Sequence, residues 1–164
     1  MNPSTVETRQ VLTRLLEDEH RLLHQLETLL EGEKAILLRD DSPEELESAC
    51  RERQRCMVAL MRLQDERQSL LRISGCSTDQ TGLAQLITIC DPERTLPARW
   101  AECAELARRC RALNDHNGAL VASRMRRIQG MLEVLTGKRS EKVTYGRLAQ
   151  QGFAARGRVF ATEV

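Results

Sequence analysis

The histidines offer the first candidate chemistry. His20 and His24 stand four residues apart, the spacing that places two side chains on one face of a helix. Glu17 precedes His20 in a Glu-x-x-His pattern, which is half the ligand set of a di-iron carboxylate site. The third histidine, His116, has no glutamate three residues before it. We expect a solvated helix surface with no metal and no cofactor, and a ferritin-like metal enzyme stays as an alternative.

The cysteines are the second group of residues that could carry chemistry. Six of them occur without a Cys-x-x-Cys pair, at positions 50, 56, 76, 90, 103 and 110. None has a histidine at a helical spacing that would activate it as a nucleophile, and the chain has no glycine-rich phosphate loop and no Gly-x-Ser-x-Gly elbow. We therefore expect reduced, structural thiols, no catalytic residue and no enzymatic activity.

The charge pattern separates the end of the chain from its body. The net charge is +1, which gives no overall attraction to nucleic acid or membrane. Residues 1–73 carry a net charge of −4, whereas residues 138–164 carry +4. Arg124, Arg126 and Arg127 form one short basic run, and we interpret it as a solvated helix face, with nucleic-acid binding as the alternative.

No apolar run approaches the roughly 18 residues of a membrane span. The first residues lack the basic and apolar regions of a signal peptide. We expect a cytoplasmic protein without membrane insertion.

The elements that carry these residues are helices. Apolar doublets recur every seven residues over 4–39, which predicts a long amphipathic helix. Ser42 as N-cap, Pro43 in the first turn and Glu45 completing a capping box predict a second helix, which runs to about Ser74 and ends before Gly75.

A connector follows over 75–96, in which 83–90 is apolar enough for a short helix. A third long helix is predicted over 98–136, closed by Gly137. The predicted fold is all-α: an elongated antiparallel bundle or coiled coil of three long helices and a connector helix over 1–137, then a flexible basic recognition segment over 138–164.

Charges within the apolar stripes predict how the first two helices pair. Glu19 and Glu33 interrupt the first stripe, and Arg53 and Arg67 interrupt the second, fourteen residues apart in each case. Facing residues of an antiparallel hairpin have a constant index sum, and both glutamate–arginine combinations give 86, which places the turn at Pro43. We expect these ion pairs mainly to fix the alignment of the two helices.

The third helix has its own apolar stripe, from Cys103 to Leu135, which we expect to pack against the other two. Asn117 and Arg124 interrupt this stripe, and Asn114 flanks it. An asparagine in a helical seam commonly sets register, so we interpret Asn114 and Asn117 as structural.

Aromatic residues are concentrated in the last segment, which holds three of the four in the chain. If this segment became helical, Tyr145, Leu148 and Phe153 would share one face, and Val159 and Phe160 would continue it. Three glycines in the segment disfavour a helix in isolation. We therefore expect it to fold when it docks, as a helix in a partner's groove.

Several motifs resemble the FlgN family over nearly the full length. The doublet helix ending before Asp-Asp-Ser-Pro is similar, and so are "RQSLLRISG", "ALNDHNGALVASRMRRIQGMLEVLTG" and "VTYG". The positions that match the family pattern are Asn114, Asn117, Gly118, Leu132, Leu135, Gly137, Tyr145 and Gly146.

The resemblance implies a helical flagellar export chaperone for the hook–filament junction proteins FlgK and FlgL, held through its C-terminal segment. It also implies that Tyr145 docks on the export gate protein FlhA. Leu148, Phe153, Val159 and Phe160 are candidate contacts to the bound protein, on the amphipathic pattern alone. We expect a monomer or weak homodimer, and a coiled-coil adaptor that oligomerises through the first helix stays as an alternative.

Overall fold

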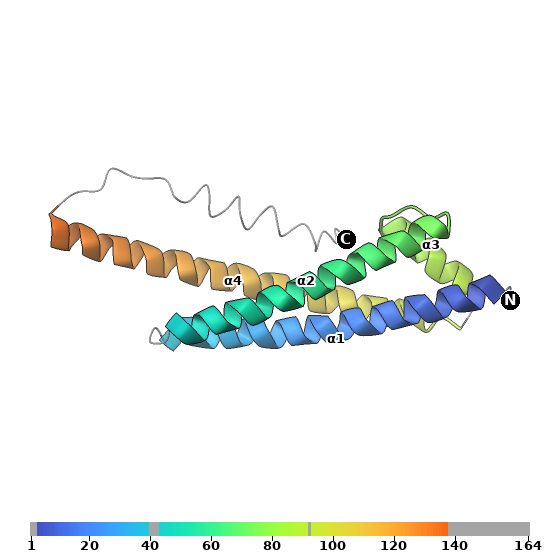
Figure 1. Cartoon of the computed structure of the whole chain (residues 1–164), viewed down its shortest axis with the longest axis horizontal. Coiled ribbons are helices and arrows are strands. Elements are labelled where there is room, and N and C mark those ends of the chain that lie inside the picture. Colours follow the sequence, from blue (N-terminus) through green and yellow to red (C-terminus); the bar gives the residue numbers. More distant parts are fainter. Residues whose placement is uncertain (1–2, 40–42, 92, 138–164) are drawn as a thin grey trace.

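Four helices build the described part of the chain, residues 3–39, 43–91 and 93–137 of a computed structural model (Figure 1). They are α1 (Pro3–Arg39), α2 (Pro43–Ile73), α3 (Gln80–Cys90) and α4 (Leu96–Thr136). These residues contain no strand. The prediction of an all-α fold with three long helices and one short connector helix is confirmed.

The central helix of the bundle is α1, which packs against both α2 and α4. The chain turns after α1, so α2 returns antiparallel to it, and α3 lies where α2 ends, beside the N-terminal end of α1 (Figure 1). Since α3 and its flanking loops lie at the N-terminal end of α1, α4 begins there and runs parallel to α1. The leucine face of α1 is buried inside the chain, so it is not exposed for oligomerisation as the adaptor hypothesis requires.

Glycines end α2 and α4, as the sequence predicts. Gly75 has a φ of 71°, and the amides of Gly75 and Cys76 donate to the carbonyls of Arg72 and Leu71, which is a Schellman motif. Gly137 caps α4 with a φ of 62°. Pro43 begins α2, whereas its predicted N-cap, Ser42, lies outside the described residues.

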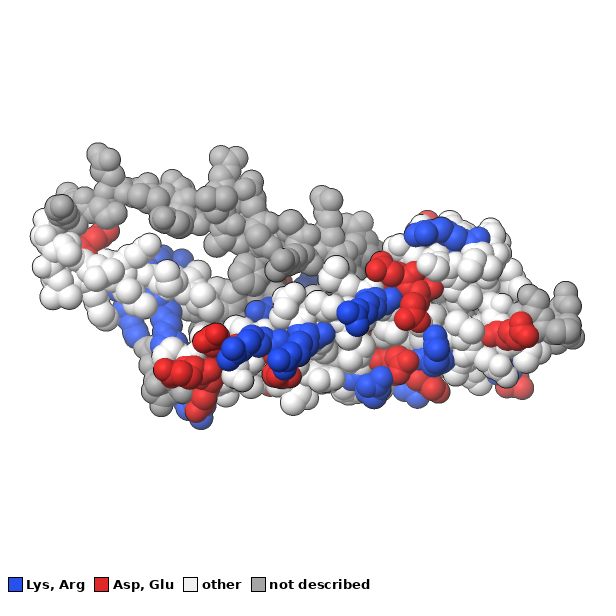
Figure 2. Space-filling view, viewed as in Figure 1, with Lys and Arg blue, Asp and Glu red and all other residues white. Residues whose placement is uncertain are grey.

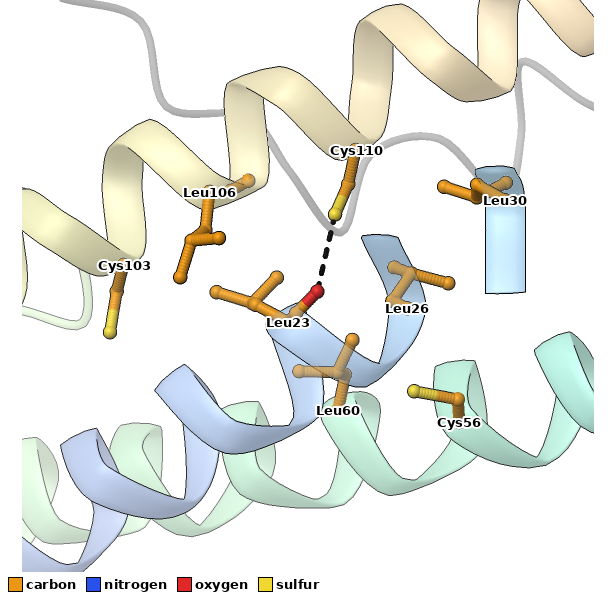
Figure 3. Close-up of a cluster of buried hydrophobic side chains, with 9 residues drawn as sticks. Leu23, Leu26, Leu30, Cys56, Leu60, Cys103, Leu106 and Cys110 are labelled. Atoms are coloured by element: carbon orange, nitrogen blue, oxygen red, sulfur yellow. Dashed lines mark hydrogen bonds between the residues drawn. The ribbon is translucent and has the colours of Figure 1, made fainter. Parts of the chain in front are cut away.

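The core divides into two clusters along the bundle. The first joins α1, α2 and α4 and contains Leu23, Leu26, Leu30, Cys56, Leu60, Cys103, Leu106, Ala107 and Cys110 (Figure 3). The second surrounds α3 and contains Leu12, Leu16, Leu71, Leu83, Leu86, Ile87, Cys90 and Leu96.

The predicted pairing of α1 with α2 is confirmed. Arg53 Nε donates to Glu33 Oε1 at 2.7 Å, and Arg67 pairs with Glu19. Each arginine also reaches α4: Arg53 Nη1 donates to Asn114 Oδ1 at 3.2 Å, and the Arg67 guanidinium lies 5.0 Å from the centroid of the Trp100 ring.

Trp100 and Asn114 are fourteen residues apart, the same interval that separates the two glutamates and the two arginines. All three long helices therefore share one axial repeat. Arg53 and Arg67 each contact α1 and α4 at one level along the bundle axis.

A second set of contacts aligns α4 with α1. Cys103 Sγ, Cys110 Sγ and Asn117 Nδ2 lie seven residues apart on α4, and they donate to the carbonyl oxygens of Leu16, Leu23 and Leu30 at 3.6, 3.4 and 2.9 Å. The index difference is 87 in every case, as a parallel pair requires. These donors hold α4 on the backbone of α1 as far as Asn117.

Asp91 fixes the direction in which α4 starts. This buried carboxylate accepts from the Leu96 amide at 2.7 Å and lies 3.4 Å from the Arg9 guanidinium of α1. Such a carboxylate at a helix N-terminus satisfies an amide that has no partner within the helix. The helix accordingly begins at Leu96, two residues before the predicted start.

Candidate functional site

The histidine pair belongs to a surface network between α1 and α4. The His20 and His24 rings meet edge to face with centroids 4.7 Å apart, and His20 Nε2 lies 3.6 Å from Glu102 Oε2. Desolvation, and then the positive charge of Arg99, lower the pKa of His20. No group of three or more histidine, cysteine or acidic side chains comes together to hold a metal within the part of the chain that the structure describes.

The buried thiols of α4 are protonated hydrogen-bond donors (Figure 3). Desolvation raises the pKa of Cys103 and of Cys110 to about 12 in each case. A thiol is a nucleophile or metal ligand only as the thiolate, so these two groups are chemically inert at neutral pH. Their contacts are instead structural.

The most unusual surface lies on the second half of α4. Figure 1 shows this helix continuing past the end of the α1–α2 hairpin as a single rod. Along it, five large apolar side chains recur at intervals of four, three, four and three residues. They are Val121, Met125, Ile128, Leu132 and Leu135, with exposed fractions of 44%, 53%, 43%, 53% and 81%. We call these five residues the distal stripe.

The distal stripe continues the buried face of α4. At about 100° per residue, its members stand on the same side of the helix as Cys103, Cys110 and Asn117. In the first half of α4 this face is covered by α1. A four–three spacing is the pattern by which one helix packs along another, so the stripe has the form of a helix-binding surface that no described helix covers.

The expectation that the whole stripe of α4 packs inside the bundle is therefore wrong for its second half. The periodicity identified the face correctly, but the same period results whether the face meets a helix of this chain or of another. A contiguous exposed apolar surface of this kind is typical of a binding site.

Asn114, Asn117, Gly118 and Gly137 mark the boundaries of this surface. Asn117 is 4% exposed and makes the last α4-to-α1 backbone contact, and Gly118 follows it at the surface. Arg53 binds Asn114 one turn earlier. Gly137 ends the helix just after the stripe.

The predicted binding residues of the final segment, Tyr145, Leu148, Phe153, Val159 and Phe160, lie outside the described residues, as does Gly146. The structure does not test them. Sequence analysis did not identify the distal stripe as a binding site. The available signal was that the apolar heptad pattern of α4 continues beyond Asn117, the last residue that contacts the backbone of α1.

Within the described part of the chain, no helix is both long enough and apolar enough to cross a bilayer. No curated protein and no solved structure matches the sequence. The family model of the FlgN protein matches residues 1–152, which is most of the chain. The chain therefore belongs to the FlgN family, the non-enzymatic flagellar export chaperones that bind the hook-associated proteins FlgK and FlgL.

Proposed function

We propose that the distal stripe of α4 and the segment after it together hold the C-terminal helix of a hook–filament junction protein, the client. The observation that carries this proposal is the exposed four–three apolar pattern from Val121 to Leu135. A client that must assemble later through an amphipathic terminus needs its apolar face covered beforehand. A second apolar helix laid along α4 covers both faces at once.

The affinity of such a contact is moderate. The stripe residues are already partly covered, and burying the remainder of each contributes roughly 1 kcal/mol. Loss of translational freedom and ordering of the client's terminus oppose this gain. The balance suits a complex that forms and dissociates, as delivery to an export machine requires.

We assign Leu148, Phe153, Val159 and Phe160 to the other side of the client helix. This role is supported by the helical face that they would share. The family model, which ends at residue 152, reaches only Leu148 of the four. In this arrangement residues 1–137 form the folded frame that carries the distal stripe, and residues 138–164 are the recognition segment.

Delivery requires a contact with the export gate, which we assign to Tyr145 binding an FlhA-like protein. Its place between the stripe and the client-contacting residues would let gate binding respond to the presence of a client. We further propose that the chaperone works in the cytoplasm as a monomer or weak homodimer.

Calorimetric titration of the full chain with a junction protein tests the role of the stripe. Ile128→Gln/Leu132→Gln should weaken binding roughly 30-fold, the equivalent of about 2 kcal/mol. Ile89→Gln is the matched control, because Ile89 is 59% exposed on α3 and lies outside the stripe. Equal affinities of the double variant and the control would exclude the distal stripe as the client site.

A further inference from the structure

The exposed apolar surface at the end of α4 is wider than the distal stripe. Met131 and Val134 are 54% and 84% exposed, and neither belongs to the stripe. At about 100° per residue they stand roughly 80° and 140° to one side of its centre. We call these two residues the distal flank. In Figure 2 the outer end of α4 is mostly uncharged, whereas charged side chains crowd the surface of the bundle.

The stripe and the flank together offer more apolar surface than one partner helix covers. From Ile128 onward they span an arc of about 160° around α4, whereas packing against one partner needs an apolar stripe of roughly 100°. In the preceding turns Arg124 and Arg127 stand on the side of the flank. The surface therefore broadens only at the end of α4, where a second helix can pack beside the client helix.

The bundle itself shows how a helix with so wide an apolar arc is used. Apolar doublets such as Leu29-Leu30 recur along α1, and this helix packs against both α2 and α4. The last turns of α4 contain two doublets of the same kind, one from the flank and one from the stripe in each pair. They are Met131-Leu132 and Val134-Leu135. By the same logic, the end of α4 is built for two partner helices.

We propose that the second partner is the chain's own segment 145–153, which lies on the distal flank beside the client helix. Gly137 ends α4 with a left-handed φ of 62°, and the seven residues 138–144 form a connection of the length that commonly joins two packed helices. So short a connection gives the segment a high effective concentration at the flank. Arg147 is its one charged residue.

The client helix is needed to complete this contact. Two flank side chains bury too little apolar surface to offset the conformational entropy that nine residues lose on docking. A helix over 145–153 would place Leu148 and Phe153 on opposite edges of one apolar face, so that one edge meets the flank and the other meets the client. The inference thus rests on the proposed function and names the partner of the flank.

Hydrogen exchange of the full chain tests the contact. Saturating junction protein should protect the amides of residues 145–153. In the complex of Met131→Gln/Val134→Gln those amides should exchange about tenfold faster, because the segment has lost its apolar support. Glutamine favours a helix and both positions are exposed, so α4 should stay folded in this variant.

Ile89→Gln is the control, because Ile89 is exposed on α3 and its loss should leave the segment protected. Absence of protection in the unmodified complex, or equal protection in the flank variant and the control, overturns the inference. Two other occupants of the flank would also overturn it. Weaker client binding with unchanged protection of 145–153 would assign the flank to the client, and a dimer that the flank variant abolishes in sedimentation would assign it to a second copy.

Failure of this inference is distinguishable from failure of the proposed function. If Ile128→Gln/Leu132→Gln weakens junction-protein binding while the flank variant keeps residues 145–153 protected, the stripe is the client site and only the partner of the flank is wrong. If the stripe variant binds the junction protein normally, the proposed client site itself is wrong.

Discussion

At the scale of single residues, Arg53 and Arg67 carry the alignment of the bundle. Each leaves α2, pairs with a glutamate of α1 and contacts α4. Burial lowers the pKa of Arg53, but attraction and hydrogen bonding to Glu33 outweigh burial and leave that pKa raised. Because burying charges carries a large desolvation cost, we assign these pairs to alignment and not to net stabilisation.

Removing one partner of the buried pair should reveal the desolvation cost of the charge that remains. The Glu33 side chain is 4% exposed, so Arg53→Met should lower the free energy of unfolding by about 3 kcal/mol, because a buried carboxylate loses its counter-charge. Glu33→Leu/Arg53→Leu should recover most of that loss. Urea unfolding measures both.

Arg55→Met is the control, since Arg55 and Glu52 form an exposed pair, and its effect should stay below about 1 kcal/mol. If the single and double variants at Glu33 and Arg53 were equally unstable, the pair would not be the source of the loss.

The buried thiols predict a stability that falls at alkaline pH. Folded Cys103 and Cys110 keep their protons to a pKa of about 12, whereas unfolded thiols release theirs near ~8.5. Between these two pKa values the folded state binds more protons than the unfolded state, so the free energy of unfolding decreases as pH rises. Below this interval the thiols do not make stability depend on pH.

The two thiols together should contribute a slope approaching about 2.7 kcal/mol per pH unit in urea unfolding. Cys103→Ala/Cys110→Ala should be less stable at neutral pH but show a much shallower alkaline decline. An unchanged slope would mean that these thiols do not titrate differently on folding.

At the scale of helices, α4 has two halves with different partners. Its first half is held against α1 by three donors to backbone carbonyls, and its second half has no described helix beside it. A helix without tertiary packing is marginally stable in water. The proposed recognition surface thus lies on the half of α4 that has no described helix packed against it.

Hydrogen exchange should resolve this difference. Amides of residues 121–136 should exchange faster than those of residues 100–117, because local opening of the unpacked half does not require the bundle to separate. Saturating junction protein should slow exchange in residues 121–136 specifically. Uniform protection along free α4 would show that its second half is covered, and would contradict an open client site.

The helices and their ends were predictable because their signals are local. Gly75 and Gly137 end helices, and the fourteen-residue interval of Glu19 and Glu33 recurs in Arg53 and Arg67, which identified the α1–α2 register. The parallel alignment of α4 was missed, since a cysteine thiol donating to a carbonyl leaves no mark on the partner's sequence.

The position of the site was harder to predict for a different reason. Periodicity reports which face of α4 is apolar but not how far α1 and α2 accompany it. That extent depends on how the α3 connector sets the starting level of α4, which is a tertiary property.

At the scale of the whole molecule, we propose that the folded core and the client-binding surface occupy different parts of the chain. The core clusters lie wholly within residues 12–110. We propose that the segment after α4 serves binding and not folding, so its loss should affect binding alone.

Deletion of residues 145–164 should leave helix content nearly unchanged and the melting temperature within about 2 °C, while junction-protein binding is lost. Circular dichroism and calorimetric titration measure the two properties. A large fall in melting temperature would mean that this segment belongs to the folded core, and retained binding would restrict the client site to α4.

The central place of α1 also bears on how the protein matures during translation. The ribosome releases α1 first, while its leucines are not yet covered by α2 or α4. The core can close only when the first half of α4 emerges. The proposed client site on the second half of α4 is completed only after the half that closes the core. If the client binds there, a nascent chaperone cannot capture a client before its own core is able to close.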